Sequence, residues 1–145
     1  PKGEFATIYL ASDLPTAYVE VESVLTVSGI PWRFARHAPL VFVAVDGRLV
    51  DMLDLTDSAI QTSLQTTVQE LTGEWRYTQS RGRPAPTQVL GKAAHDSGRF
   101  LGLVAPSSKN PESQIVAVFF DRLKSSTRSE STVHDPDSNL IQRLP

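Results

Sequence analysis

Two glutamates, Glu20 and Glu22, lie on a segment whose apolar residues recur with helical spacing. A carboxylate can act as a general base, and it can stabilise positive charge that develops on a substrate. At about 100° per residue, the two side chains fall on opposite edges of the apolar stripe, where each can be partly desolvated and still reach a cleft. The spacing does not choose between them. Taken alone, it favours solvated glutamates at the edge of a buried stripe.

Ser107 and Tyr9 are the other candidates for contact with a ligand. Ser107 stands in a polar loop after a short apolar run, where its hydroxyl can bond to ribose or phosphate oxygens or to the backbone of its own turn. No histidine–aspartate pair is near it in the sequence, so we expect a binding role rather than a nucleophilic one. Tyr9 alternates with Ile8 and Leu10 in a predicted strand, and its ring faces away from both. There it either stacks on an aromatic ligand or packs under a helix.

Composition excludes or disfavours several other kinds of site. The 145 residues include no cysteine, which excludes disulfides, thiolate metal sites and cysteine nucleophiles. His37, His95 and His134 are too far apart for a metal-binding motif, and we expect no metal cofactor. A formal net charge of −2 argues against nucleic acid as a partner, because such binding requires a basic surface. The glycine-rich loops that bind nucleotide phosphates are missing as well.

Strands and helices are predicted to alternate along the chain. The first predicted elements are a strand over 6–11 and a helix from Ser12-Asp13-Leu14-Pro15 to Gly29, followed by a hairpin of Val41–Val45 and Leu49–Leu55 around Asp46-Gly47. Next comes a helix that Thr56 or Asp57 caps, with Ile60, Leu64, Val68 and Leu71 in register. A helix from Pro86 to Gly98 and strands over 100–104 and 115–120 complete the prediction. The predicted buried stripe of the first helix consists of Leu14, Ala17, Tyr18, Val21, Val24 and Leu25. The hairpin makes part of the sheet antiparallel, so the predicted fold class is α+β with a mixed sheet and flanking helices.

We expect a single domain over residues 1–145, because no linker separates two apolar regions. Residues from about 124 to 145 form a mostly polar C-terminal segment. No apolar run approaches the ~18 residues of a membrane span, and no signal-peptide pattern opens the chain. We therefore expect a cytoplasmic protein. Its oligomeric state is left open, with a homo-oligomer as one alternative.

Short blocks along the chain resemble those of the RES domain family, in family order. The matching blocks are Tyr9-Leu10-Ala11 with Thr16-Ala17-Tyr18-Val19-Glu20-Val21, then Asp54-Leu55-Thr56-Asp57, then Pro86-Thr87-Gln88-Val89-Leu90-Gly91 with Gly102-Leu103-Val104-Ala105-Pro106-Ser107. They extend from Tyr9 to about Phe120, each with a suitable element predicted under it. Together they are fairly specific for the family.

The resemblance implies a fold related to ADP-ribosyltransferases and a substrate, NAD⁺, whose nicotinamide–ribose bond is broken. Glu20 matches the family glutamate and Ser107 the family serine, while Tyr9 matches the aromatic residue that members place against the cofactor. We therefore expect Glu20 to be catalytic and Tyr9 and Ser107 to bind NAD. Cleavage of an N-glycosidic bond passes through an oxocarbenium-like sugar, and a carboxylate beside the ribose stabilises its charge.

Three activities remain open under this resemblance. NAD⁺ can be cleaved by water or phosphate, as in a glycohydrolase or phosphorylase, or its ADP-ribose can be transferred to a protein target. The third alternative is a non-catalytic binding module or remnant, because the family arginine lies before the tyrosine strand and Lys2 is the one cation among residues 1–8 here. We therefore expect the family's N-terminal segment to be incomplete. RES toxins pair with antitoxins, so we also expect a helical antitoxin partner encoded nearby.

Overall fold

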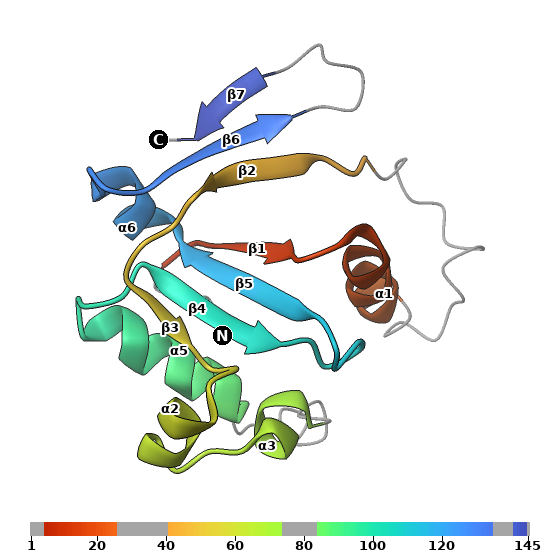
Figure 1. Ribbon diagram of the computed structural model, residues 1–145, viewed down its shortest axis with the longest axis vertical. Helices are drawn as coiled ribbons and strands as arrows, with labels where there is room; N and C mark the ends of the chain where they lie inside the picture. The colour runs from red at the N-terminus through yellow and green to blue at the C-terminus, as the bar shows by residue number, and fades with distance from the viewer. Residues whose placement is uncertain (1–4, 26–40, 74–83, 135–140, 145) are drawn as a thin grey trace.

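The computed structural model describes residues 5–25, 41–73, 84–134 and 141–144 (Figure 1). Its elements are β1 (Thr7–Ala11), α1 (Leu14–Leu25), β2 (Ala44–Arg48), β3 (Met52–Asp54), α2 (Ser58–Ser63), α3 (Val68–Thr72), α5 (Pro86–Asp96), β4 (Gly102–Pro106), β5 (Gln114–Phe119), α6 (Phe120–Ser125), β6 (Glu130–His134) and β7 (Ile141–Leu144).

Four strands form the larger sheet, in the order β1-β5-β4-β3. β5 pairs antiparallel with β1 and β4, while β3 pairs parallel with β4. Consequently β1, β4 and β3 all run in one direction, and their carboxyl ends lie at the same edge of the sheet. The predicted α+β class with a mixed sheet is confirmed.

Each face of this sheet is covered by a different layer. On one face, α3 and α5 contact β4 and enclose the main core, which consists of Leu53, Leu55, Leu71, Ala94, Leu103, Ala117 and Phe119. On the other face, a smaller cluster of Leu101, Val118 and Leu123 packs with Ile8, Leu10 and Leu49. Burying one leucine or phenylalanine side chain fully is worth about 1.5–3 kcal/mol, so these two layers supply the main stabilisation of the sheet.

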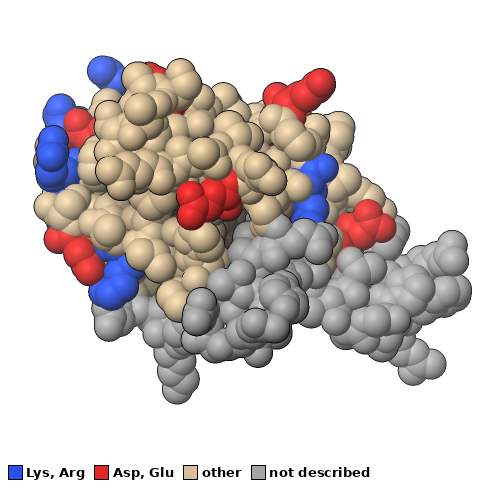
Figure 2. Space-filling model, turned by 90° about the horizontal axis from the view of Figure 1, so that it is seen from below, with Lys and Arg blue, Asp and Glu red and all other residues tan. Residues whose placement is uncertain are grey.

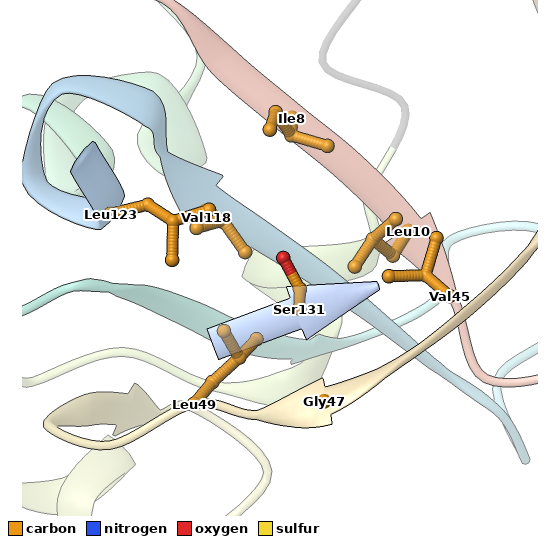
Figure 3. Close-up of a pocket in the computed structure, with 8 residues that line it drawn as sticks. All are labelled: Ile8, Leu10, Val45, Gly47, Leu49, Val118, Leu123 and Ser131. Carbon is orange, nitrogen blue, oxygen red and sulfur yellow. The ribbon is translucent and has the colours of Figure 1, made fainter. Parts of the chain in front are cut away.

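A second sheet, in the order β2-β6-β7, lies over the smaller cluster. The two sheets leave between them a cavity of about 80 Å³ with a mostly aliphatic lining (Figure 3). Its lining residues are Ile8, Leu10, Val45, Gly47, Leu49, Val118, Leu123 and Ser131. The Ser131 hydroxyl points into this space and has no hydrogen-bond partner in the part of the chain that the structure describes.

The hairpin predicted around Asp46-Gly47 is wrong. These two residues lie inside β2, where they pair with Thr132 and Ser131 of β6, and β3 belongs to the other sheet. Gly47 serves a different purpose from a turn: a Cβ there would collide with the backbone carbonyl of Glu130. The glycine therefore permits close approach of two strands.

The single helix predicted after Thr56 is also interrupted. It is divided into α2, which Asp57 caps by accepting from the Ala59 amide, and the separate helix α3. Gln65 lies between them with φ of 55°, a left-handed conformation that an α-helix cannot contain. Leu71 is buried as expected, but Leu64 and Val68 are exposed.

The predicted helix from Pro86 agrees with α5, and the strands predicted over 100–104 and 115–120 agree with β4 and β5 to within two residues at each end. The polar C-terminal segment contributes the end of α6 and the strands β6 and β7, which pair with β2 in the second sheet. Hydrophobic periodicity does not reveal these strands, because polar residues such as Ser131 and Thr132 occupy the middle of β6.

Candidate functional site

Helix α1 follows β1 directly and starts at a strong cap. The Asp13 carboxylate accepts from the Thr16 amide at 2.8 Å, and Pro15 stands in the first turn, where its missing N–H costs nothing. This backbone hydrogen bond from Thr16, followed by bonds from the Thr16 and Ser113 hydroxyls, lowers the pKa of Asp13 to about 2. Asp13 is therefore ionised at neutral pH.

The side of α1 that carries Thr16 is polar, so the predicted apolar stripe is wrong at two positions. Thr16 is completely buried, whereas Leu14 and Tyr18 of the predicted stripe are exposed. Ala17 and Val21 of the stripe are partly buried, and the side chains of Val24 and Leu25 lie outside the described part. Asp13, Thr16 and Glu20 are spaced three and four residues apart, so they lie along one side of the helix. That side faces the loop that follows β4.

Glu20 and Ser107 meet across this contact. The Ser107 hydroxyl donates to Glu20 Oε1 at 2.6 Å, and Ser107 is completely buried. The same hydroxyl oxygen accepts from the amides of Lys109 at 3.1 Å and Asn110 at 3.0 Å. With both lone pairs occupied, the Ser107 proton is directed at the carboxylate. Two residues 87 positions apart in the sequence thus form one unit.

Glu20 uses one of its two carboxylate oxygens in this contact. Oε2 has no hydrogen bond to any residue that the structure describes, and the side chain is half-buried at the surface. Glu22 lies about 200° further around the helix and does not share this contact with Ser107. The geometry therefore distinguishes two glutamates that the sequence pattern alone does not.

Tyr9 lies in the middle of β1, opposite Ala117 of β5, which in turn pairs with Leu103 of β4. Its side chain is on the same face of the sheet as the main core, and it is 72% exposed. No ring contact to Tyr9 exists among residues 5–25, 41–73 and 84–134. Of the two alternatives for this ring, packing under a helix is not what the structure shows.

The site lies at the edge of the sheet where β1, β4 and β3 have their carboxyl ends. Helix α1 leaves β1 there, and Ser107 directly follows β4 (Figure 1). Glu20 and Ser107 thus meet at this edge although the strands that they follow, β1 and β4, are not neighbours in the sheet.

Surface charge, possible metal ligands and helix length are three further features of the described residues. On the face seen in Figure 2, acidic and basic side chains alternate over the described surface. Within the described ranges, no group of three or more histidine, cysteine, aspartate or glutamate residues is arranged to hold a metal ion. Of the helices in those ranges, none has the length and apolar character needed to cross a membrane.

Two of the three histidines fall within the described residues. The His95 side chain is mostly buried. It stacks on Phe5 with ring centroids 3.8 Å apart, and its Nε2 lies 3.0 Å from Asp121. His134 lies 3.2 Å from Asp46 of the neighbouring strand, and His37 is outside the described residues. His95 of α5 therefore contacts both Phe5, which precedes β1, and Asp121 of α6.

The family model of the RES domain matches residues 1–139. The chain belongs to the RES domain family. No curated protein and no solved structure matches it. Membership supports a toxin-like role connected with NAD, and it agrees with the blocks from which the resemblance was inferred.

Sequence reasoning missed four residues that build this site: Asp13, Thr16, Asn110 and Ser113. Asp13 was noted only as part of a helix start, and the other three side chains are bonded through tertiary contacts. One local signal was present, because polar residues at 13, 16 and 20 follow the spacing of one helix face. The apolar residues of the same segment follow helical spacing too, and the prediction was based on them.

Proposed function

We propose that this RES domain consumes NAD⁺ by breaking the bond between nicotinamide and ribose, with water or phosphate receiving the ADP-ribose. The observation that supports this most is the hydrogen bond between Glu20 and Ser107. A carboxylate is held in place by a buried hydroxyl at the sheet edge where β1, β4 and β3 have their carboxyl ends, and its other oxygen bonds to no described residue. Such an oxygen suits a developing oxocarbenium ion.

In the proposed reaction, the C1′–N bond breaks and its electron pair leaves with neutral nicotinamide. Glu20 Oε2 stabilises the positive charge that spreads over C1′ and the ring oxygen of the ribose. A water or phosphate oxygen then bonds to C1′, and the proton of an attacking water passes through Glu20 to solvent. Cleavage thus needs a carboxylate that stays ionised and fixed in place.

Ser107 and Tyr9 contribute to NAD binding in this proposal. Because the Ser107 hydroxyl is buried and donates to Glu20, it acts on the ribose by orienting the carboxylate. The exposed ring of Tyr9 is suited to stack on the nicotinamide or adenine ring, which is worth about 0.5–1.5 kcal/mol beyond the area buried.

The test is turnover by the full-length protein. Purified protein is incubated with NAD⁺, with and without phosphate, and released nicotinamide is measured by chromatography. We expect turnover to be lost in Glu20→Gln, which keeps the size of the side chain, and to be retained in Glu22→Gln. Folded wild-type protein that releases no nicotinamide in either condition contradicts the proposal, and an inactive Glu22→Gln with an active Glu20→Gln contradicts the residue assignment.

Transfer of ADP-ribose to a protein target uses the same donor and the same carboxylate. A second assay therefore distinguishes this transfer from cleavage by water or phosphate. NAD⁺ labelled in its adenine ring is added to a cell extract together with the enzyme. We expect the label to remain in small molecules. Label fixed on a protein band shows that transfer is the reaction instead.

We also propose that a helical antitoxin restrains the enzyme by covering this edge. Tyr9 and Leu14, on the two elements that lead into the site, are 72% and 61% exposed. The product of a short open reading frame next to the gene is co-expressed with the RES domain. We expect this product to abolish toxicity and to co-purify with the domain. Leu14→Ser is expected to weaken co-purification, with Val68→Ser as an exposed control on α3. If no neighbouring product relieves toxicity, the partner proposal fails.

A further inference from the structure

Three successive positions on one side of α1 are hydrogen-bonded to one loop. Ser113 donates to Asp13 Oδ2 at 2.8 Å, Asn110 donates to Thr16 Oγ1 at 2.9 Å, and Ser107 donates to Glu20 Oε1 at 2.6 Å. On the helix these positions are three and four residues apart, and on the loop three apart. Helix α1 is therefore joined to the loop along its first two turns.

The first two connections form a closed ring of hydrogen bonds. Asn110 Nδ2 donates both to Thr16 Oγ1 and to Ser113 Oγ, at 2.9 and 3.0 Å. Ser113 in turn donates to Asp13, whose other oxygen accepts from the Thr16 amide. Because Thr16 is completely buried, water does not compete for its hydroxyl. The ring fixes the rotation of α1 about its own axis relative to the loop.

Asn110 also connects the ring to the third contact. Its backbone N–H donates to Ser107 Oγ at 3.0 Å while its side chain holds Thr16. One residue thus sets both the helix that carries Glu20 and the hydroxyl that points at Glu20. A rotation of α1 or a shift of the loop changes the position of the carboxylate directly.

We propose that Thr16 and Asn110 are positioning residues, which act on the reaction only through Glu20. This inference rests on the proposed function, since it assigns them to the same carboxylate. Displacement of a catalytic group by about 1 Å can lower a rate by around a hundredfold. Loss of the ring is therefore expected to reduce kcat, whereas KM for NAD⁺ changes little because neither side chain faces the ligand.

The principal variants change hydrogen bonding and keep size. Thr16→Val removes the hydroxyl at constant shape, and Thr16→Ser restores it. Asn110→Asp removes both side-chain donors and keeps the backbone bond to Ser107. Glu112→Gln, on an exposed residue of the same loop, is the control. We expect kcat to fall at least about tenfold in Thr16→Val and Asn110→Asp, KM to change less than about threefold, and Thr16→Ser and Glu112→Gln to keep kcat.

A second readout does not depend on turnover. Amide hydrogen exchange at Lys109 and Asn110 reports the bonds to Ser107 Oγ, and exchange at Leu103 and Ala117, a hydrogen-bonded pair, reports the β4–β5 pairing. We expect Thr16→Val and Asn110→Asp to speed exchange at the two loop amides and not in the strands. If the wild type does not consume NAD⁺ but this pattern holds, the proposed function fails and the positioning role stands.

Two results overturn the proposal. In the first, kcat and loop exchange keep wild-type values in both variants. In the second, the strands exchange faster by the same factor as the loop, which shows a general loss of stability. If Thr16→Val does not fold, Asn110→Asp and Ser113→Ala decide the question by the same two measurements.

Discussion

At the scale of single residues, the hydrogen bonds of the Ser107 hydroxyl define the site. Ser107 uses its proton for Glu20 and its lone pairs for two backbone amides. The family blocks predicted Glu20 and Ser107 as members of one site, but their direct contact was not predicted. That contact depends on how α1 is rotated, and Thr16 and Asn110 set this rotation through bonds that no local pattern encodes. The role of Tyr9 stays a prediction.

Ser107→Ala is expected to lower kcat by about tenfold to a hundredfold, because a hydrogen bond to a charged group is worth about 1.5–3 kcal/mol. The substitution also leaves the amides of Lys109 and Asn110 without their acceptor. Ser108→Ala, one residue further along the loop, is the matched control and should keep wild-type kcat. Steady-state kinetics of nicotinamide release measures both. Equal kcat in the two variants shows that the Ser107 hydroxyl does not serve Glu20.

Asp13 is expected to make stability depend on pH below 4. Its pKa is lowered from 3.8 to about 2 in the folded protein, chiefly by the Thr16 amide. A lowered pKa means that the ionised form favours folding, so this stabilisation is fully present above the unfolded value and is lost as the pH falls toward 2. Asp13→Asn should unfold with a shallower pH dependence between pH 4 and 2, measured by urea titration at each pH. A slope equal to that of wild type contradicts the assignment.

At the scale of elements, prediction succeeded where local pattern and tertiary context agree. Helix α5 has Pro86 in its first turn and Gly98 just beyond its end, with φ of 69°, and it forms where the sequence indicates. Asp46-Gly47 shows the opposite case. The pair is a strong turn signal, but in this fold Gly47 lies inside a strand. Its lack of a side chain lets the neighbouring strand β6 approach closely. Which use a glycine has depends on a partner distant in the sequence.

Gly47 and Gly91 should respond to alanine in opposite directions. In Gly47→Ala the new methyl group meets the Glu130 carbonyl, so the strands must separate, at a cost of about 1–3 kcal/mol. In Gly91→Ala, inside α5, the nearest atom is Leu103 Cδ1 at 3.7 Å, an ordinary contact, and stability should rise by up to about 1 kcal/mol. Thermal unfolding of both variants tests this. Stabilisation by Gly47→Ala contradicts the strand pairing.

At the scale of the whole molecule, the second sheet faces the smaller apolar cluster of the first across a cavity (Figure 3). The sequence predicted one domain with one mixed sheet, and it did not reveal the second sheet. β2 was assigned to a hairpin, and the strands β6 and β7 lie in a segment whose polar composition hides them. The second sheet is itself built by pairings between residues about 85 positions apart, such as Gly47 of β2 with Ser131 of β6.

The Ser131 hydroxyl is expected to weaken the packing between the two sheets. It is buried beside the aliphatic cavity and has no partner in the described part of the chain. An unsatisfied buried hydroxyl is costly, so Ser131→Ala should raise the free energy of unfolding by about 1 kcal/mol. Ser129 provides the matched control. It is buried and directly precedes the strand that carries Ser131, but its Oγ accepts a hydrogen bond from the Val50 amide at 3.1 Å. Ser129→Ala should lower the free energy of unfolding by a similar amount. Urea unfolding of both variants measures the difference, and a loss of stability in Ser131→Ala equal to that in Ser129→Ala shows that the Ser131 hydroxyl is satisfied.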